Sequence, residues 1–156
     1  MTVADALFAD RPAPGIPDLF GPLIGDWRVR NRQLDESTRE WSESAFTWSF
    51  ARTLGGLGVQ DVIVLDDAEA AGTTVRAWDA AAGVWRASWF GVRGRNFSSF
   101  VARATEDGIR LDGRGSDGRD LHWEFSALTD DGFAWDGHVR AAGGWLHEQH
   151  MDAVRA

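Results

Sequence analysis

The segment Phe46-Thr-Trp-Ser-Phe50 alternates bulky apolar side chains with small polar ones at a period of two. The same alternation returns in Leu121-His-Trp-Glu-Phe-Ser126 and in Phe133-Ala-Trp-Asp136. Successive side chains of a β-strand point to opposite faces, so each segment predicts a strand with one apolar face. No long pattern with the 3.6-residue period of a helix follows Trp27. The sequence therefore predicts an all-β fold.

Clusters of turn-forming residues separate the alternating segments. Gly115-Ser-Asp-Gly118 and Asp130-Asp-Gly132 are two of them, and such clusters recur roughly every 8–14 residues, as in an antiparallel meander. Counting the segments between them gives about ten strands. The predicted strands cover residues 26–34, 40–53, 57–65, 73–79, 84–90, 97–104, 108–113, 120–128, 133–140 and 145–154.

A meander with one apolar face can hide both of its edges by closing on itself. We therefore expect a closed antiparallel up-and-down β-barrel of about 8–10 strands, which is wide enough to hold a ligand. A two-sheet sandwich is the alternative, and the short connections favour the barrel. Residues 1–16 predict an extended arm, and Pro17–Ile24 predict one short helix with Pro17 near its first position. Residues 17–156 would then form a single barrel domain.

Composition excludes several classes of partner and chemistry. The 156 residues carry a net charge of −8, which disfavours nucleic acid and anionic membranes. There is no cysteine, and all 16 basic residues are arginine, so thiolate chemistry and a Schiff-base lysine are excluded. The first ten residues carry acids where a signal peptide needs basic residues, which favours a cytoplasmic location. A monomer and a homodimer both remain open.

The segment Leu23-Ile-Gly-Asp-Trp27 resembles the Gly-x-Trp signature that opens the first strand of lipocalins. In that family the Trp closes the barrel floor against an Arg from a late strand, which implies Arg140 or Arg155 here. Further scattered positions, from Trp48-Ser-Phe50 to Gly144-Trp-Leu-His-Glu148, resemble a bacterial group of lipocalin-like proteins of mostly unassigned function. The resemblance implies a barrel of the calycin superfamily.

The last segment, His150-Met-Asp-Ala-Val-Arg155, resembles the closing pattern of nitrobindin. Nitrobindin is a ten-stranded barrel that holds ferric haem through a C-terminal histidine. The resemblance implies His150 as a haem ligand, although other haem-pocket motifs of that family are not evident. No other cofactor is expected.

The aromatic content points to a lined cavity. There are nine Trp and nine Phe, and each can form a rigid wall of about 150–250 Å². The first hypothesis is therefore binding of a small hydrophobic or aromatic molecule inside the barrel. The predicted ligand-binding residues are Trp48, Phe50, Trp78, Trp89, Phe100, Trp123, Trp135 and Gln149.

A cofactor-free enzyme on the same barrel, such as a cyclase, isomerase or dehydratase, is the alternative. Arg76 would stabilise an anion, because a buried guanidinium must be paired or must meet an anionic group. His147 or Glu148 would act as acid–base. An ordinary salt bridge of Arg76 or Arg86 to Asp79 or Glu124 is the competing interpretation.

The run His147-Glu-Gln-His150 is one residue short of the zinc-protease pattern His-Glu-x-x-His. In a regular strand, positions 147 and 150 point to opposite faces, so no metal site is expected. The alternation of side chains along a strand places Trp145, His147, Gln149 and Met151 on one face. This face carries more apolar side-chain surface than the other, which favours it as the inner face. The nitrobindin resemblance would instead turn His150 inward, and the two interpretations conflict.

Overall fold

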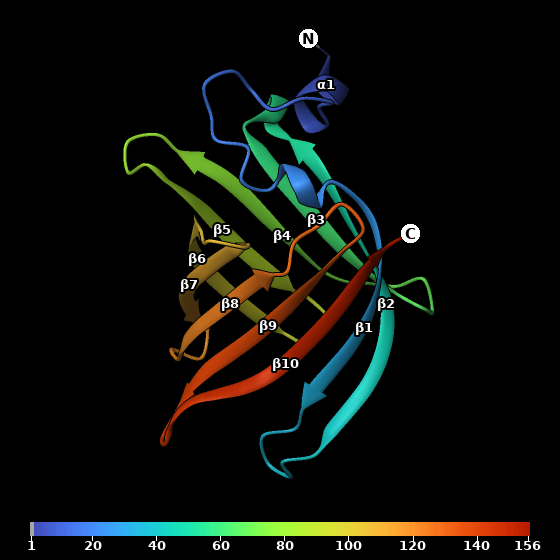
Figure 1. Ribbon diagram of the computed structural model, residues 1–156, viewed down its shortest axis with the longest axis vertical. Helices are drawn as coiled ribbons and strands as arrows, with labels where there is room; N and C mark the ends of the chain where they lie inside the picture. Colours follow the sequence, from blue (N-terminus) through green and yellow to red (C-terminus); the bar gives the residue numbers. More distant parts are fainter. Residues whose placement is uncertain (1) are drawn as a thin grey trace.

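A computed structural model describes residues 2–156 as a barrel of ten antiparallel strands that closes on itself (Figure 1). Each strand pairs with the next along the chain, and the last pairs with the first. All ten predicted strands are present, and the alternative of two packed sheets is wrong. The strands are β1 Gly25–Leu34, β2 Trp41–Thr53, β3 Gly58–Leu65, β4 Ala70–Asp79, β5 Val84–Gly91, β6 Asn96–Ala104, β7 Ile109–Gly115, β8 Asp120–Ser126, β9 Gly132–Ala141 and β10 Gly144–Arg155.

The N-terminal segment differs from the prediction. A short helix, α1 (Val3–Leu7), falls within the arm that was predicted to be extended, because Thr2 and Asp5 cap it reciprocally. The predicted helix over 17–24 is only one 3₁₀ turn, η1 (Gly21–Leu23), which ends where Ile24 returns to an extended backbone. A second 3₁₀ turn, η2 (Leu54–Gly56), joins β2 to β3. Within residues 2–156, no helix has the length and apolar content needed to cross a bilayer.

Trp27 and Arg155 close one end of the barrel. The indole Nε1 of Trp27 donates to the carbonyl of Leu23 at 2.8 Å, and the Arg155 guanidinium lies 3.8 Å from the Trp27 ring. The Arg155 guanidinium also donates to the carbonyls of Ile24, Pro22 and Asp130. Of the two arginines that the lipocalin resemblance implied, Arg155 is therefore the partner of Trp27.

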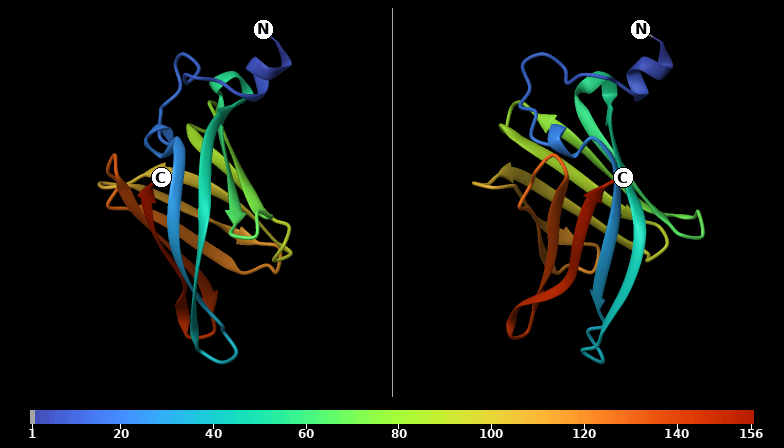
Figure 2. Two further views of the ribbon diagram at one scale, coloured as in Figure 1. Left: turned by 90° about the vertical axis from the view of Figure 1, so that its right-hand side faces the viewer. Right: turned by 45° about the vertical axis from the view of Figure 1, so that its right-hand side comes forward.

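This closed end is packed solidly. Phe20, Leu23 and Trp27 are fully buried, and Phe133 meets the Trp27 ring edge-on at 4.7 Å. Figure 2 shows the N-terminal segment confined to this end, away from the β1–β2 and β9–β10 turns. The interior is therefore reached from the opposite end, where those turns lie.

We expect Arg155→Ala to loosen the closed end. The variant loses several charge-assisted hydrogen bonds and the contact with the indole, so the free energy of unfolding should fall by about 1–2 kcal/mol. Denaturant unfolding measures the change. Arg140→Ala is the matched control, because Arg140 lies over the exposed ring of Trp145 at 5.6 Å. An equal loss in both variants would contradict a special role for Arg155.

Candidate functional site: an aromatic chamber and its mouth

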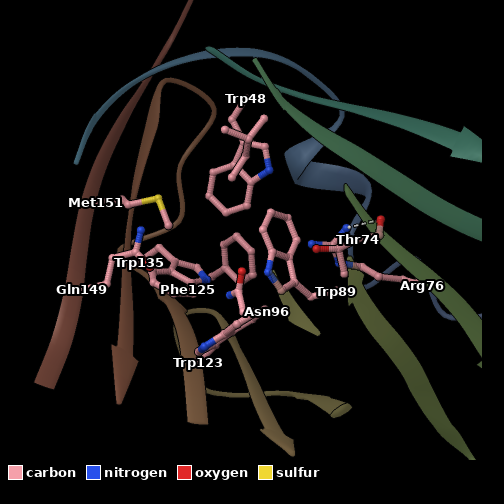
Figure 3. A pocket seen from close by; sticks show the side chains of 11 residues that line it. Trp48, Thr74, Arg76, Trp89, Asn96, Trp123, Phe125, Trp135, Gln149 and Met151 are labelled. Carbon is pink, nitrogen blue, oxygen red and sulfur yellow. Dashed lines mark hydrogen bonds between the residues drawn. The ribbon is translucent and has the colours of Figure 1, made fainter. Parts of the chain in front are cut away.

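A cavity of about 80 Å³, here called the inner chamber, lies inside the barrel. Aromatic rings form most of its wall, with a few polar groups between them. Figure 3 shows Arg76 and Thr74 on one side and Gln149 and Met151 on the other, with aromatic rings between them. The lining residues are Trp48, Ile63, Thr74, Arg76, Trp89, Asn96, Trp123, Phe125, Trp135, Gln149 and Met151.

Two glycines in the wall make room for the indoles. A Cβ atom at Gly72 would lie 2.4 Å from the ring of Trp89, and one at Gly137 would lie 2.7 Å from the ring of Trp135. Both distances are far below van der Waals contact, so a larger residue would force the ring to move. The rings also contact one another, with Trp123 centred 5.3 Å from Trp135. These close approaches fix the shape of the chamber.

A buried ion pair spans the β3–β4 side of the interior. Arg76 Nη2 donates to Asp61 Oδ2 at 2.6 Å, and the two side chains are only 2% and 0% exposed. Asp61 Oδ1 also accepts the backbone N–H of Thr74 at 2.8 Å. The guanidinium lies about 5 Å from the ring centres of Phe20 and Phe50. The pair is therefore neutral overall and held between aromatic rings.

Two N–H donors that border the chamber lack a hydrogen-bond partner among residues 2–156. They are Nε of Arg76 and Nε1 of Trp48, and both atoms are buried. Leaving a buried donor unpaired costs about 1–3 kcal/mol, so buried donors are normally paired with protein, water or ligand. Both residues line the chamber, so these two N–H groups are the candidates for binding an acceptor there.

A wider and more polar cavity of about 300 Å³, here called the mouth, opens next to the chamber. Asn96, Trp123 and Gln149 line both spaces, so the two are adjacent. Together they reach the lower end of the ~300–1,000 Å³ range of small-molecule sites. The remaining residues of the mouth are Gln33, Arg95, Phe97, Ser98, Gly115, Ser116, Asp117, Arg119, Leu121, Val139 and Glu148.

Charged groups give the mouth a defined electrostatic pattern. Arg119 donates to both carboxylate oxygens of Glu36 at 2.9 and 3.0 Å, and its Nε donates to Asp117 at 2.9 Å. The hydrogen bond from Arg119 lowers the pKa of Glu36. Burial raises the pKa of Glu148, with the neighbouring Glu36 adding to the effect. Glu148 is thus the residue of the mouth that most readily takes up a proton.

The structure brings five of the eight predicted ligand-binding residues to the chamber. These are Trp48, Trp89, Trp123, Trp135 and Gln149. The other three do not line it. Phe50 packs against Trp48 of the wall at 4.9 Å, and Phe100 packs against Trp123 of the wall at 4.1 Å. Trp78 instead contacts Trp85, which lies outside the chamber lining, at 5.9 Å.

A β-bulge interrupts the pairing of β10 with β9. The expected inward face of the last strand is therefore right for Gln149 and Met151 and wrong for Trp145 and His147. His147 pairs with His138, but the next pair is Gln149 with Gly137, so Glu148 is an extra residue. Gln149 faces the chamber as expected. His147, expected to face inward with it, instead lies on the outer surface beside His138.

The predicted catalytic residues are therefore not brought together. Arg76 lies inside the barrel, paired with Asp61, and Glu148 lies at the mouth. His147 lies outside the wall, where its ring stacks on His138 at 4.7 Å. Arg86 forms the expected surface salt bridge, with its Nε 2.6 Å from Asp79.

The structure does not fit haem ligation by His150. Its ring lies on the outer face of the barrel, with Nδ1 2.7 Å from Asp136 and Nε2 3.3 Å from Asp152. Both ring nitrogens thus face carboxylates rather than the interior, where the nitrobindin resemblance would place them. The inner chamber, at about 80 Å³, is also far too small for a porphyrin.

Asp61 is the main site residue that the sequence reasoning missed. It occupies the inward parity of β3, between Val59 and Ile63, so the period of two contained the signal. A carboxylate at such a position predicts a buried partner, and Arg76 on the next strand is the nearest cation in the same parity class.

Comparison with known proteins supports the fold. No protein-family model matches the sequence, and no curated protein matches it either. The crystal structure of Rv2717c from M. tuberculosis is similar in structure, with a TM-score of 0.60. The match covers 90% of this chain and 99% of that chain, at 15% sequence identity. At this identity the likeness concerns the fold alone and not a ligand.

We expect single substitutions in the Asp61–Arg76 pair to be strongly destabilising. Asp61→Asn or Arg76→Met leaves a buried charge without its partner, at about 3–5 kcal/mol. The double variant Asp61→Asn/Arg76→Met removes both charges and should lose clearly less than the sum of the single losses. Denaturant unfolding of all variants completes the cycle. Arg114→Met is the control, because its pair with Asp120 is exposed. Additive losses would contradict a coupled buried pair.

Glu148 should make stability depend on pH. Because its pKa is raised in the folded state, the native protein holds this proton more tightly than the unfolded chain. The stabilisation that comes from holding this proton is present in full below pH 4.5, the ordinary pKa of a glutamate. It is lost as the pH rises through the raised pKa of Glu148 in the folded state. Glu148→Gln should therefore be more stable than the parent protein at about pH 7.5, and the two should converge near pH 4. A difference that is equal at both pH values would contradict this assignment.

Proposed function

We propose that this calycin-like barrel binds a small, largely apolar or aromatic molecule that carries a hydrogen-bond acceptor at the end that enters first. The observation that carries the proposal is the pair of unpartnered buried donors, Trp48 Nε1 and Arg76 Nε, beside an aromatic chamber. A carbonyl, ether or similar oxygen placed between them would supply the missing acceptor. The aromatic walls would cover the apolar part of the ligand.

The charge balance supports a neutral acceptor at the inner end. Asp61 already neutralises Arg76, so an additional carboxylate would lie beside a buried carboxylate. The polar end of the ligand would remain in the mouth, near Asn96, Gln149 and Arg119. The ligand is thus expected to be amphipathic, with its apolar part in the chamber and its most polar part toward solvent.

Acetophenone and cumene test this proposal as a pair of similar size. The carbonyl oxygen of acetophenone is replaced in cumene by a methyl group and a hydrogen on the same carbon. Cumene is the more hydrophobic, so a non-specific void would prefer it. We expect acetophenone to bind about 10-fold more tightly, in keeping with one satisfied buried donor. Titration followed by the indole N–H signals in ¹H–¹⁵N NMR measures both affinities and locates the contact.

Trp48→Phe provides the internal control, since it keeps an aromatic ring and removes the donor. The variant should lose the preference for acetophenone and keep its affinity for cumene. Trp145→Phe changes an exposed indole outside the chamber and should alter neither affinity. Failure of both probes to bind, or tighter binding of cumene to the parent protein, would contradict the proposal.

A further inference from the structure

All four histidines of the chain lie together on the outer face of β8, β9 and β10. His122 pairs with His138 across the β8–β9 ladder, and His138 pairs with His147 across the β9–β10 ladder. Their ring centres are 4.5 and 4.7 Å apart, and His150 follows at 6.3 Å from His147. None of these rings lines the inner chamber or the mouth. The row is therefore separate from the proposed ligand site.

The β-bulge gives this row its shape. If β10 were regular, with Glu148 paired like its neighbours, His147 and His150 would point to opposite faces. With the bulge, both rings lie on the outer face, on either side of Asp136 of β9. Asp136 Oδ1 lies 2.8 Å from Nε2 of His147 and 2.7 Å from Nδ1 of His150. No metal site was expected from the sequence, because positions 147 and 150 of a regular strand point to opposite faces. In the structure both side chains are on one face, so this reason does not hold.

The donor atoms of these three side chains converge. One atom from each of Asp136, His147 and His150 lies within 4.8 Å of the other two. Two imidazole nitrogens and one carboxylate oxygen are a ligand set that zinc takes in proteins, with a fourth position left open for water. The side chains are only partly exposed, at 28%, 41% and 26% respectively, so their positions are restrained by their neighbours.

A second carboxylate stands behind one of these imidazoles. Asp152 Oδ2 lies 3.3 Å from Nε2 of His150, the ring nitrogen that does not face Asp136. Metal-binding histidines commonly donate this second N–H to a carboxylate, which fixes the tautomer and orients the ring. His138 stacks on His147 with an angle of 24° between the rings, which restrains that ring as well. Both histidines are thus held in place from outside the ligand set.

We propose that Asp136, His147 and His150 form a zinc-binding site on the outer wall of the barrel. Zinc replaces the protons that lie between the carboxylate and the two rings, and water completes the coordination. Asp152 acts as a positioning residue through His150. The site links β9 to β10 across the bulge.

Isothermal titration of metal-free, untagged protein with Zn²⁺ tests the site directly. We expect one Zn²⁺ per chain, and a rise in the unfolding temperature when the metal is present. Asp136→Asn and His150→Ala should each weaken binding by about 100-fold, and Asp152→Asn by about 10-fold. His122→Ala is the matched control, since this ring belongs to the same outer row but not to the ligand set, and it should bind as the parent does. Circular dichroism confirms that each variant is folded.

Visible absorption of the Co²⁺-substituted protein gives a second measurement that does not depend on stability. The intense bands of a four-coordinate site should appear in the parent protein and in His122→Ala, and should be absent from Asp136→Asn. Lack of Zn²⁺ binding by the parent, or equal binding by the parent and Asp136→Asn, would overturn the proposal. Neither result would bear on the chamber inside the barrel.

Discussion

The hydrogen-bonded pairing of β1 with β10 turns the meander into a ring, and the rest of the structure depends on it. Seven residue pairs, from Trp27 with Arg155 to Gln33 with Gln149, join the two ends of the sheet. Closure forces the apolar faces of all ten strands toward one axis, so the indoles of different strands must share one interior. Trp27 and Arg155 seal one end of that interior, and the polar mouth remains at the other.

Inside the barrel, the closed end is filled by apolar side chains, whereas the chamber contains buried polar groups. The closed end is filled by side chains such as Phe20 and Trp27, which are fully buried. Farther in, aromatic rings and Arg76 of the Asp61–Arg76 pair line a chamber that is bordered by residues whose N–H donors are unpaired among residues 2–156. A barrel designed only for stability would place aliphatic side chains here, because a buried ion pair offers little net stabilisation. The polar groups of the interior therefore accord with the ligand binding proposed above.

The fold could be predicted from the sequence because side-chain parity and turn residues are local signals. The alternation in Phe46–Phe50 was sufficient for its strand, and Gly-x-Trp pointed to the floor that Trp27 and Arg155 form. Five of the eleven residues that line the chamber were among the predicted ligand-binding residues. The bulge at Glu148 could not be predicted, because an extra residue in one strand is defined only by its partner strand. That single residue reverses the orientation of His147 relative to Gln149, so that His147 joins the other histidines on the outer face.

A crystal structure of the purified protein would test the central claim, that the closed ring keeps a hollow interior with free donors, most directly. The decisive observation is the electron density bounded by Trp48, Trp89 and Arg76. The account predicts ordered water or a small molecule there, within hydrogen-bonding distance of Trp48 Nε1 and Arg76 Nε. Aromatic rings in direct contact across that region, with both donors bonded to other protein groups, would contradict it.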